Sequence, residues 1–206
     1  MNILIAGMGR SGSTVIFNIV KELLYSKYDD IYFSHEFDFN EKLCKDINLL
    51  KTHSKDYGNW PDIIITTRRD LRDVLSSFKQ FHKSYTSGKI NEWVTLFMNW
   101  HQQWVDKTDY EVIYEKYIRD KSTIIKDISN IIGITDYSEI DIIEKIDNLK
   151  NVKNIKGKFD KSTLIHPNHI TNKGKIGSYK TTLTDNEIKV VNEIAGEWLK
   201  KYGYEK

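Results

Sequence analysis

The chain has 206 residues, and its 31 Lys and Arg against 29 Asp and Glu give a formal net charge of +2. This length is enough for one domain with a buried core, and an aromatic content of 12% argues against disorder. The balanced charge gives no support to a basic coat for nucleic acid, so an anion would have to be bound by a local cluster of cations. A single cysteine, Cys44, excludes an internal disulfide framework.

The apolar residues 2–6 look like the start of a signal peptide, but no basic region precedes them and the run is too short. No stretch approaches the roughly 18 apolar residues that are needed to span a bilayer. We therefore expect a soluble, cytoplasmic protein without a membrane span. No feature of the sequence indicates its oligomeric state.

The chain opens with alternating strand and helix patterns. Residues 2–6 predict a short buried strand that ends at Gly7, and a Gly- and Ser-rich turn follows. Residues 14–26 carry apolar side chains at helical spacing, which predicts a helix with one face turned inward. Weaker strand patterns cover residues 31–34 and 48–52.

The strongest strand pattern covers residues 62–67, which are β-branched and apolar on both faces, as in a central parallel strand. Asp70 follows as the predicted N-cap of a helix. A second helix is predicted over about residues 89–106, and we expect its largely aromatic stripe to pack in the core. That stripe consists of Trp93, Val94, Phe97, Trp100 and Trp104.

The second half of the chain continues the alternation. Residues 110–114 predict a further strand, followed by one helix to about residue 132 and another over about 138–149. Residues 150–180 have weak periodicity and many Lys, Asn and Gly, so we expect a long loop. Loops of this length in a compact domain are usually functional or disordered.

The last helix has a clear start and end, because Thr184 and Glu187 form a capping box and Gly203 follows its apolar face. Strands that alternate with helices predict an α/β fold. We expect residues 1–206 to form a single domain with a central parallel sheet flanked by helices.

The first strand–helix junction has the composition of a phosphate-binding loop. Free backbone N–H groups at a helix start, together with the helix dipole, favour an anion there. Residues 7–14 nearly match the nucleotide-hydrolase pattern G-x-x-x-x-G-K-[ST], but Ser13 stands at the position of the Lys, and Arg10 inside the loop supplies the cation. A dinucleotide-binding pattern is weaker, because no acidic residue follows a clear second strand. We predict an anion site rather than glycines that only permit a tight turn.

A second anion site is predicted after the strongest strand. Arg69 closes that strand, and Ser77 follows eight residues later on the next predicted helix. Ligands of parallel sheets bind beyond the carboxyl ends of the strands, where a long Arg and a Ser hydroxyl can converge on one phosphate. Taken alone, a surface ion pair between Arg69 and Asp73 is the simpler interpretation.

Histidines at two places in the sequence are candidates for chemistry. Lys51 and His53 follow an apolar run at another predicted strand end, where a His can act as a general base near neutral pH. An ordinary hydrogen-bonded His is the alternative there. His166 and His169 invite a zinc interpretation, but no second ligand cluster accompanies them, so we expect no metal.

The order of these motifs resembles that of the sulfotransferases that use 3′-phosphoadenosine 5′-phosphosulfate (PAPS) as donor. Lys51 to His53 is similar to the Lys-Thr-His segment whose His is the base in cytosolic members of that family. Arg69 and Ser77 match the 3′-phosphate motif in identity and spacing. The segment that is similar to the family's 5′-phosphosulfate loop consists of Gly9, Arg10, Ser11, Gly12, Ser13 and Thr14.

Two later motifs extend the resemblance over nearly the whole chain. Tyr114, followed by Glu115, matches the position where a family Tyr lies by the adenine. Lys173 and Gly174 belong to a segment that resembles the one that closes over the 3′-phosphate.

The sequence departs from the family pattern at several points. Asn172 stands in place of an Arg, so that phosphate contact is lost or is supplied by Lys173 or Lys175. Val15 stands where cytosolic members have an adenine-stacking Trp. The chain is also shorter than typical members, which implies trimmed acceptor-binding loops.

The resemblance implies a three-layer, P-loop NTPase-like architecture and in-line transfer of a sulfuryl group from PAPS to a hydroxyl or amine, without a metal. The second product would be adenosine 3′,5′-bisphosphate (PAP). Arg10 and the loop N–H groups would stabilise charge on the leaving 5′-phosphate, and Lys51 would add positive potential. His53 would take the acceptor proton, with Glu36 as the rival base. The loop over residues 150–180 would close over the donor.

Two other functions stay open on the sequence alone. A P-loop kinase or other nucleotide phosphotransferase is disfavoured by Ser13 at the Lys position and by the lack of a clear Mg²⁺-binding Asp at a strand end. A non-catalytic nucleotide-binding module would keep the fold and lack a working base. The acceptor is equally open between a glycan, a small phenol, a lipid-linked group and a peptide hydroxyl.

Overall fold

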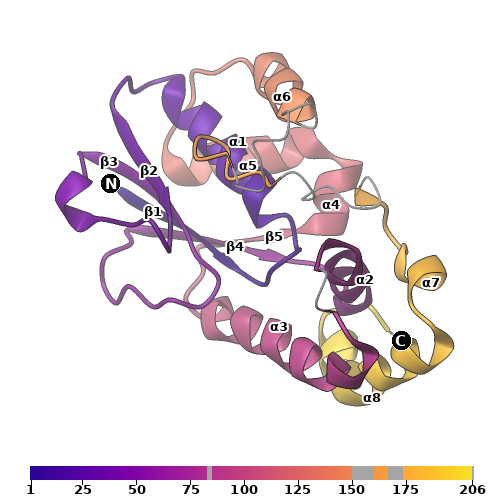
Figure 1. The fold of residues 1–206 in the computed structure, drawn as a ribbon. Coiled ribbons are helices and arrows are strands. Elements are labelled where there is room, and N and C mark those ends of the chain that lie inside the picture. The colour runs from indigo at the N-terminus through magenta and orange to yellow at the C-terminus, as the bar shows by residue number, and fades with distance from the viewer. Residues whose placement is uncertain (83–84, 150–159, 167–173, 206) are drawn as a thin grey trace.

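One parallel sheet forms the centre of the structure, a computed structural model that describes residues 1–82, 85–149, 160–166 and 174–205 (Figure 1). In this part of the chain five strands pair in the order β2-β3-β1-β4-β5, and every pairing is parallel. All the strands expected from the sequence are present, including the two with weaker patterns. The strands are β1 (Asn2–Gly7), β2 (Ile31–His35), β3 (Ile47–Lys51), β4 (Ile63–Arg68) and β5 (Tyr110–Ile113).

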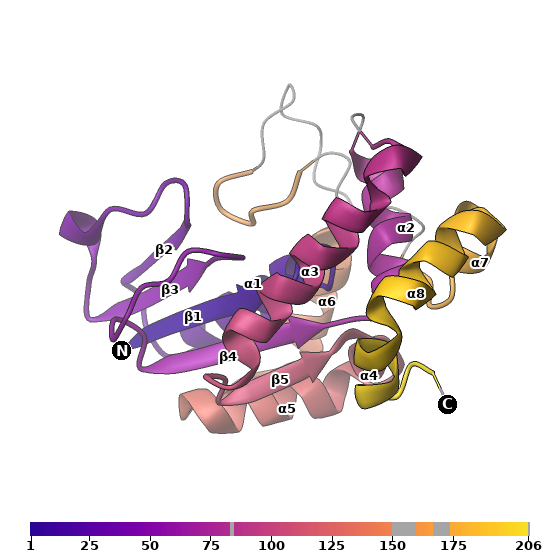
Figure 2. The same ribbon diagram turned by 90° about the horizontal axis from the view of Figure 1, so that it is seen from below.

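Helices cover both faces of the sheet and complete three layers (Figures 1 and 2). The α-helices in the described residues are α1 (Ser13–Tyr25), α2 (Leu71–Phe81), α3 (Ile90–Val105), α4 (Tyr114–Arg119), α5 (Lys121–Ile132), α6 (Glu139–Asn148), α7 (Tyr179–Thr182) and α8 (Asp185–Lys201). Of these described helices, none combines the length and the apolar composition needed to cross a membrane.

Successive side chains of the central strand β1 point to opposite faces of the sheet, and both sets are apolar, so both faces are covered by helices. Ile3 and Ile5 belong to a buried cluster with α1, α5 and α6, whereas Leu4 and Ala6 pack with Trp104 of α3 on the other side. Helices α2 and α8 extend this second layer by packing on α3. The expected α/β class with a central parallel sheet flanked by helices is therefore confirmed.

The segment after β5 differs from the single helix that the apolar spacing predicts. It forms α4 and α5, which are separated by Asp120 with a φ of −147°. The Asp120 carboxylate accepts a hydrogen bond from the Thr123 N–H at 3.0 Å and so caps α5. A capping side chain, which leaves the apolar spacing unbroken, therefore sets this boundary.

Part of the segment that was expected to be a long loop is anchored on α1. Lys21 donates from its Nζ to the Ser162 carbonyl at 2.7 Å, and Leu164 is buried in the cluster that contains α1. Helical structure resumes at Tyr179, just before the expected end of the loop. The residues of this segment that the sequence singles out and that lie outside the described part of the chain are His169, Asn172 and Lys173.

The parallel arrangement brings the carboxyl ends of all five strands to one edge of the sheet. In the register of the strands Gly7 lies opposite Thr67, and Lys51 lies opposite both Ile5 and His35. The segments that follow β1, β3, β4 and β5 therefore meet at this edge, where ligands of parallel sheets bind.

Candidate active site at the carboxyl edge of the sheet

The glycine turn, residues 7–13 at the end of β1, contains left-handed backbone conformations that favour glycine. Gly7 and Gly12 have φ values of +113° and +95°. A Cβ at Gly12 would also lie 2.7 Å from Cδ2 of Tyr114, so a side chain has no room there. The buried hydroxyl of Ser11 lies 2.5 Å from that of Thr67, which ties the turn to β4. The turn thus presents the amino end of α1, with its backbone N–H groups, at the edge of the sheet.

Three further residues of the glycine loop, Gly9, Ser13 and Thr14, are closely packed. Ser13 and Thr14 form the first turn of α1 and are buried. Gly9 faces the aromatic side of α3, and a Cβ there would lie 3.1 Å from Cζ3 of Trp100 and 3.3 Å from Cε1 of Phe97. The loop therefore contacts α3 as well as β4, and its position relative to both is fixed.

Arg10 connects the two anion motifs that the sequence predicts separately. It has a φ of +64°, which is uncommon for a residue other than glycine. Its Nε and Nη2 donate to the hydroxyl oxygen of Ser77 at 3.1 and 2.9 Å, and its guanidinium lies 4.4 Å from the ring centre of Phe81. Burial, with the charge of Arg69 adding to it, lowers the pKa of Arg10 to about 10. The guanidinium is therefore still charged at neutral pH.

Arg69 lies buried between the glycine turn and the segment that begins at Gly174. It donates from Nη1 to the Arg10 carbonyl at 3.4 Å and from Nη2 to the Lys175 carbonyl at 3.2 Å. Its Nε is buried and has no hydrogen-bond partner among the described residues. The alternative of a surface pair with Asp73 is half right, because the two groups lie 3.8 Å apart but both are buried.

Tyr114 forms a wall between the glycine turn and the late segment. Its ring lies 4.3 Å below the guanidinium of Arg69 and next to Gly12. Its hydroxyl donates to the Gly174 carbonyl at 3.3 Å. Gly174 has a φ of +72°, and a Cβ there would lie 2.4 Å from the Tyr114 hydroxyl oxygen. Both glycines therefore allow the Tyr114 ring to lie close to the backbone.

His53 lies across Gly7 from these residues, with its ring held in one orientation. Nδ1 is 2.9 Å from the Gly7 carbonyl. A carbonyl only accepts hydrogen bonds, so Nδ1 carries the proton in the neutral ring and Nε2 carries the lone pair. The Nζ of Lys51 lies 3.3 Å from that Nε2. The indole of Trp100 stacks on the imidazole with 5.2 Å between ring centroids and 15° between planes.

Lys51 is a buried cation next to His53. Its side chain ends β3, and the residue is 4% exposed. Burial lowers the pKa of Lys51 to about 8, the charge of Glu36 opposes this, and the charge of Arg10 adds to it. The ammonium thus titrates close to neutral pH.

Glu36, the rival base, is already hydrogen-bonded to Thr52 and His53, the two residues that follow β3. Its Oε2 accepts hydrogen bonds from the Thr52 hydroxyl and from the His53 N–H, the latter at 3.2 Å. This carboxylate therefore fixes the turn that carries His53.

The structure adds residues to the site that the sequence interpretation did not assign to it. His35 ends β2 with its ring centroid 6.4 Å from that of His53, and burial lowers its pKa to about 4, with the charge of Lys51 adding to the shift. Its position next to Glu36 was the available signal. Trp100 was assigned to core packing, and periodicity alone could not distinguish it from the buried Trp104.

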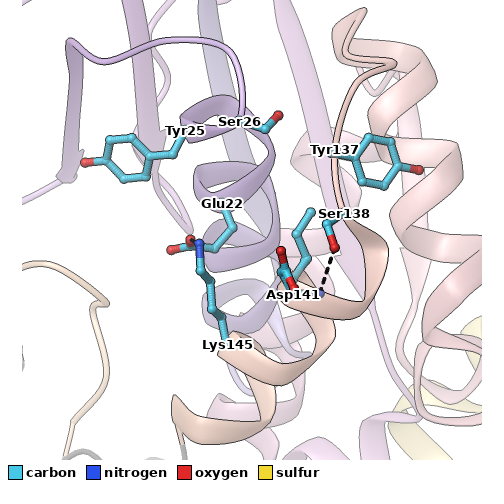
Figure 3. Close-up of a pocket in the computed structure, with 8 residues that line it drawn as sticks. Glu22, Tyr25, Ser26, Tyr137, Ser138, Asp141 and Lys145 are labelled. Atoms are coloured by element: carbon cyan, nitrogen blue, oxygen red, sulfur yellow. Dashed lines mark hydrogen bonds and ion pairs between the residues drawn. The ribbon is translucent and has the colours of Figure 1, made fainter.

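Within the described residues, no group of three or more His, Cys, Asp and Glu is arranged to hold a metal ion. His166 lies edge-on to Phe81 at 5.4 Å between centroids, and His169 lies outside the described residues. A crevice of about 200 Å³ opens between the carboxyl-terminal part of α1 and the start of α6 (Figure 3). Glu22 and Lys145 pair there at 2.9 Å, at the opposite end of α1 from the glycine turn.

Solved structures share this fold over nearly the whole chain. The mouse sulfotransferase SULT7A1 complexed with PAP matches with a TM-score of 0.67 at 17% identity, over 98% of this chain and 88% of that one. Retinol dehydratase in complex with androsterone and the inactive cofactor PAP matches with a TM-score of 0.62 at 15% identity, over 97% and 80% of the two chains. Retinol dehydratase with retinol and PAP gives a TM-score of 0.63 at 12% identity, over 97% and 81%. At these identities the likeness establishes the fold.

Sequence comparison gives the family. No curated protein matches the chain significantly. The family model for the sulfotransferase domain matches residues 62–203, a range that begins after Arg10 and His53 and includes Arg69, Ser77 and Tyr114. Because this match covers well over half of the sequence, the chain belongs to the sulfotransferase domain family.

Proposed function

We propose that this chain is a PAPS-dependent sulfotransferase in which residues 1–206 form a single catalytic domain. The observation that carries the proposal is the double hydrogen bond from Arg10 to Ser77 beside the buried Arg69, with Lys51 and His53 across Gly7. A cation cluster and a candidate base thus lie on two sides of one turn. The PAP present in the matching sulfotransferase and retinol dehydratase structures supports PAPS as the donor.

The residues present fit a donor that has a phosphate at each end of its ribose. The buried Nε of Arg69 lacks a hydrogen-bond partner in the described part of the chain, and a 3′-phosphate oxygen would satisfy it. Arg10 remains charged at neutral pH, as binding of the 5′-phosphosulfate requires. The proposed donor-binding residues are Gly9, Arg10, Ser11, Gly12, Ser13 and Thr14 for the 5′ end, and Arg69, Ser77, Tyr114, Lys173 and Gly174 for the remainder.

PAPS supplies the sulfuryl group, whose in-line transfer leaves negative charge on the 5′-phosphate. Arg10 and the backbone N–H groups at the start of α1 stabilise that charge from fixed positions, so little reorganisation is needed during the reaction. His53 accepts the proton of the acceptor hydroxyl or amine at Nε2. Its Nδ1–H stays on the Gly7 carbonyl, and the Trp100 face beneath the ring stabilises the imidazolium that forms.

Lys51 changes its partner in this scheme. In the structure its ammonium lies at hydrogen-bond distance from the Nε2 lone pair of His53. Before that nitrogen can take a proton, Lys51 must turn its N–H to the acceptor oxygen or to the sulfuryl group. The same movement frees the base and brings a positive charge to the reacting atoms.

Glu36 has a supporting role in this proposal. Its Oε2 accepts hydrogen bonds from the backbone N–H of His53 and from Thr52, and it is a source of the negative potential that keeps the buried Lys51 protonated. His53 is therefore the better candidate for the base.

Thermal unfolding with ligands tests the donor assignment. A ligand at about 100 times its dissociation constant raises the unfolding free energy by roughly 2.7 kcal/mol. We expect PAP to stabilise the protein, and AMP and NAD to do so far less at the same concentration. Stabilisation by ATP–Mg²⁺ alone would instead indicate a nucleotide phosphotransferase.

Transfer of label from radiolabelled PAPS to fractionated host extract tests the activity itself. The expected result is a labelled product in at least one acceptor fraction, lost when His53 is replaced. PAP binding without transfer to any fraction or to a broad panel of acceptors would point to a non-catalytic nucleotide-binding module.

A further inference from the structure

One fully buried carboxylate, Asp73 on α2, holds the segment that follows Gly174. Its Oδ2 accepts a hydrogen bond from the Gly177 N–H at 2.7 Å. Its Oδ1 accepts from the Ser178 hydroxyl and from the Tyr179 N–H, both at 3.0 Å. Asp73 itself is 0% exposed. Three donors from three consecutive residues thus converge on a single side chain that lies about a hundred residues earlier in the sequence.

The same segment is attached to the proposed donor site at two further points. Arg69 donates to the Lys175 carbonyl at 3.2 Å, and the Tyr114 hydroxyl donates to the Gly174 carbonyl at 3.3 Å. Gly174 and Gly177 both have left-handed φ values, +72° and +74°, so the backbone turns at each end of this short stretch. Residues 174–179 are therefore docked on the ends of β4 and β5 and on α2.

Asp73 lies close to Arg69 but leaves hydrogen-bond donors of its guanidinium unused. The neighbouring ion pair between Arg72 and Asp70 is much closer. Arg72 of α2 and Asp70, the N-cap of that helix, make three close contacts between the guanidinium and the carboxylate, at 2.8, 3.0 and 3.3 Å. Arg69 and Asp73 lie 3.8 Å apart instead, because the carboxylate oxygens are occupied by the donors of residues 177–179. The Nε of Arg69 meanwhile stays buried and lacks a partner among the described residues.

We propose that Asp73 is a positioning residue for donor recognition, which docks residues 177–179 on α2 and orients the Arg69 guanidinium toward the 3′-phosphate. This inference rests on the proposed function, because it takes a nucleotide with a 3′-phosphate as the ligand. A buried carboxylate costs free energy, and here three hydrogen bonds and a nearby cation offset that cost. Asn at this position would keep one acceptor oxygen and lose the charge that orients Arg69.

Calorimetric titration of the full-length protein with PAP and with AMP tests the inference, because AMP lacks only the 3′-phosphate. We expect Asp73→Asn to reduce the ratio of PAP affinity to AMP affinity by about tenfold, the scale of one charge-assisted hydrogen bond. Hydrogen exchange over residues 174–180 should become faster in the same variant, because the Gly177 and Tyr179 amides bond to different oxygens of Asp73 and Asn keeps only one of them.

Asp70→Asn is the matched control. It also removes a buried carboxylate near the start of α2, and it should lower thermal stability while leaving the ratio of PAP to AMP affinity unchanged. Ser178→Ala, which removes one of the three donors, serves if Asp73→Asn does not fold. It should lower the ratio in the same direction but less, by about threefold, because the charge of Asp73 and its two bonds to the backbone remain.

The outcomes separate this inference from the function on which it rests. A wild-type protein with no preference for PAP over AMP would overturn both the 3′-phosphate site and the role of Asp73. A clear preference that survives in Asp73→Asn and Ser178→Ala, or equal losses of PAP and AMP in these variants, would reject the positioning role alone.

Discussion

Lys51 occupies the side of His53 at which an acceptor proton would arrive. The Gly7 carbonyl fixes the proton on Nδ1 of His53, and the Lys51 ammonium occupies the space in front of Nε2. Trp100 prevents the ring from turning away, because the two planes are nearly parallel at 15°. In the proposed mechanism, His53 is therefore oriented before an acceptor binds, and Lys51 blocks its Nε2 until the lysine side chain turns away.

Replacing His53 with Ala should separate catalysis from binding. We expect turnover of labelled PAPS to fall by roughly 10²-fold or more, the usual scale for loss of a general base, while PAP binding measured by calorimetry stays nearly intact. Glu36→Gln is the companion variant. Gln still offers an oxygen to the His53 N–H, so most of the turnover should be retained when it is measured well below the pKa of Lys51, where loss of the Glu36 charge leaves the ammonium protonated. Undiminished turnover in His53→Ala, with a loss in Glu36→Gln, would transfer the role of base to Glu36.

Lys51 gives the reaction a predicted alkaline limit. Its pKa is lowered to about 8, so the ammonium is present below that pH and is lost as the pH rises through it. Turnover that needs the positive charge should therefore decline above about pH 8. The pH profile of Lys51→Arg should lack this decline, because a guanidinium stays charged. An identical decline in the two proteins would show that another group titrates.

At the scale of whole elements, the strand ends were the predictable part of the site. Residues 63–67 are all β-branched, and the position of Arg69 at the end of that strand followed from this pattern alone. The break between α4 and α5 was not predictable from spacing, because Asp120 acts through a capping hydrogen bond. The contact between Arg10 and Ser77 joins residues 67 positions apart, and no local pattern reports on such a distance.

Gly12 tests how closely the glycine turn packs against Tyr114 of α4. We expect Gly12→Ala to lower the unfolding free energy, measured with urea, by more than the roughly 1–2 kcal/mol that a left-handed φ alone costs an Ala. The excess arises because the new Cβ would lie 2.7 Å from the Tyr114 ring. PAP binding should weaken as the turn shifts.

Gly133 offers the matched control for this turn. It has a φ of +70°, and a Cβ there meets nothing within 4 Å, so Gly133→Ala should incur the backbone cost only. The variant should bind PAP like the wild type. Equal destabilisation by both substitutions, with unchanged PAP binding in each, would contradict the claim that the Tyr114 ring leaves no room for a side chain at Gly12.

At the scale of the whole molecule, the net charge of +2 conceals a concentration of positive charge at one edge of the sheet. Arg10 and Arg69 lie close enough that the charge of Arg69 lowers the pKa of Arg10, and Arg10 in turn lowers that of Lys51. Lys51 ends β3, and Arg10 and Arg69 follow β1 and β4, so only the parallel topology brings the three cations together. A bound polyanion would relieve this repulsion, which agrees with a donor that carries several negative charges.

The most direct test of this account is a calorimetric comparison of wild-type protein and Arg69→Ala with PAP and with AMP. We expect the wild type to bind PAP more tightly than AMP, and Arg69→Ala to lose affinity for PAP while its affinity for AMP is nearly unchanged. Equal losses for the two nucleotides, or a wild type that does not distinguish them, would contradict the claim that this edge of the sheet binds a 3′-phosphorylated donor.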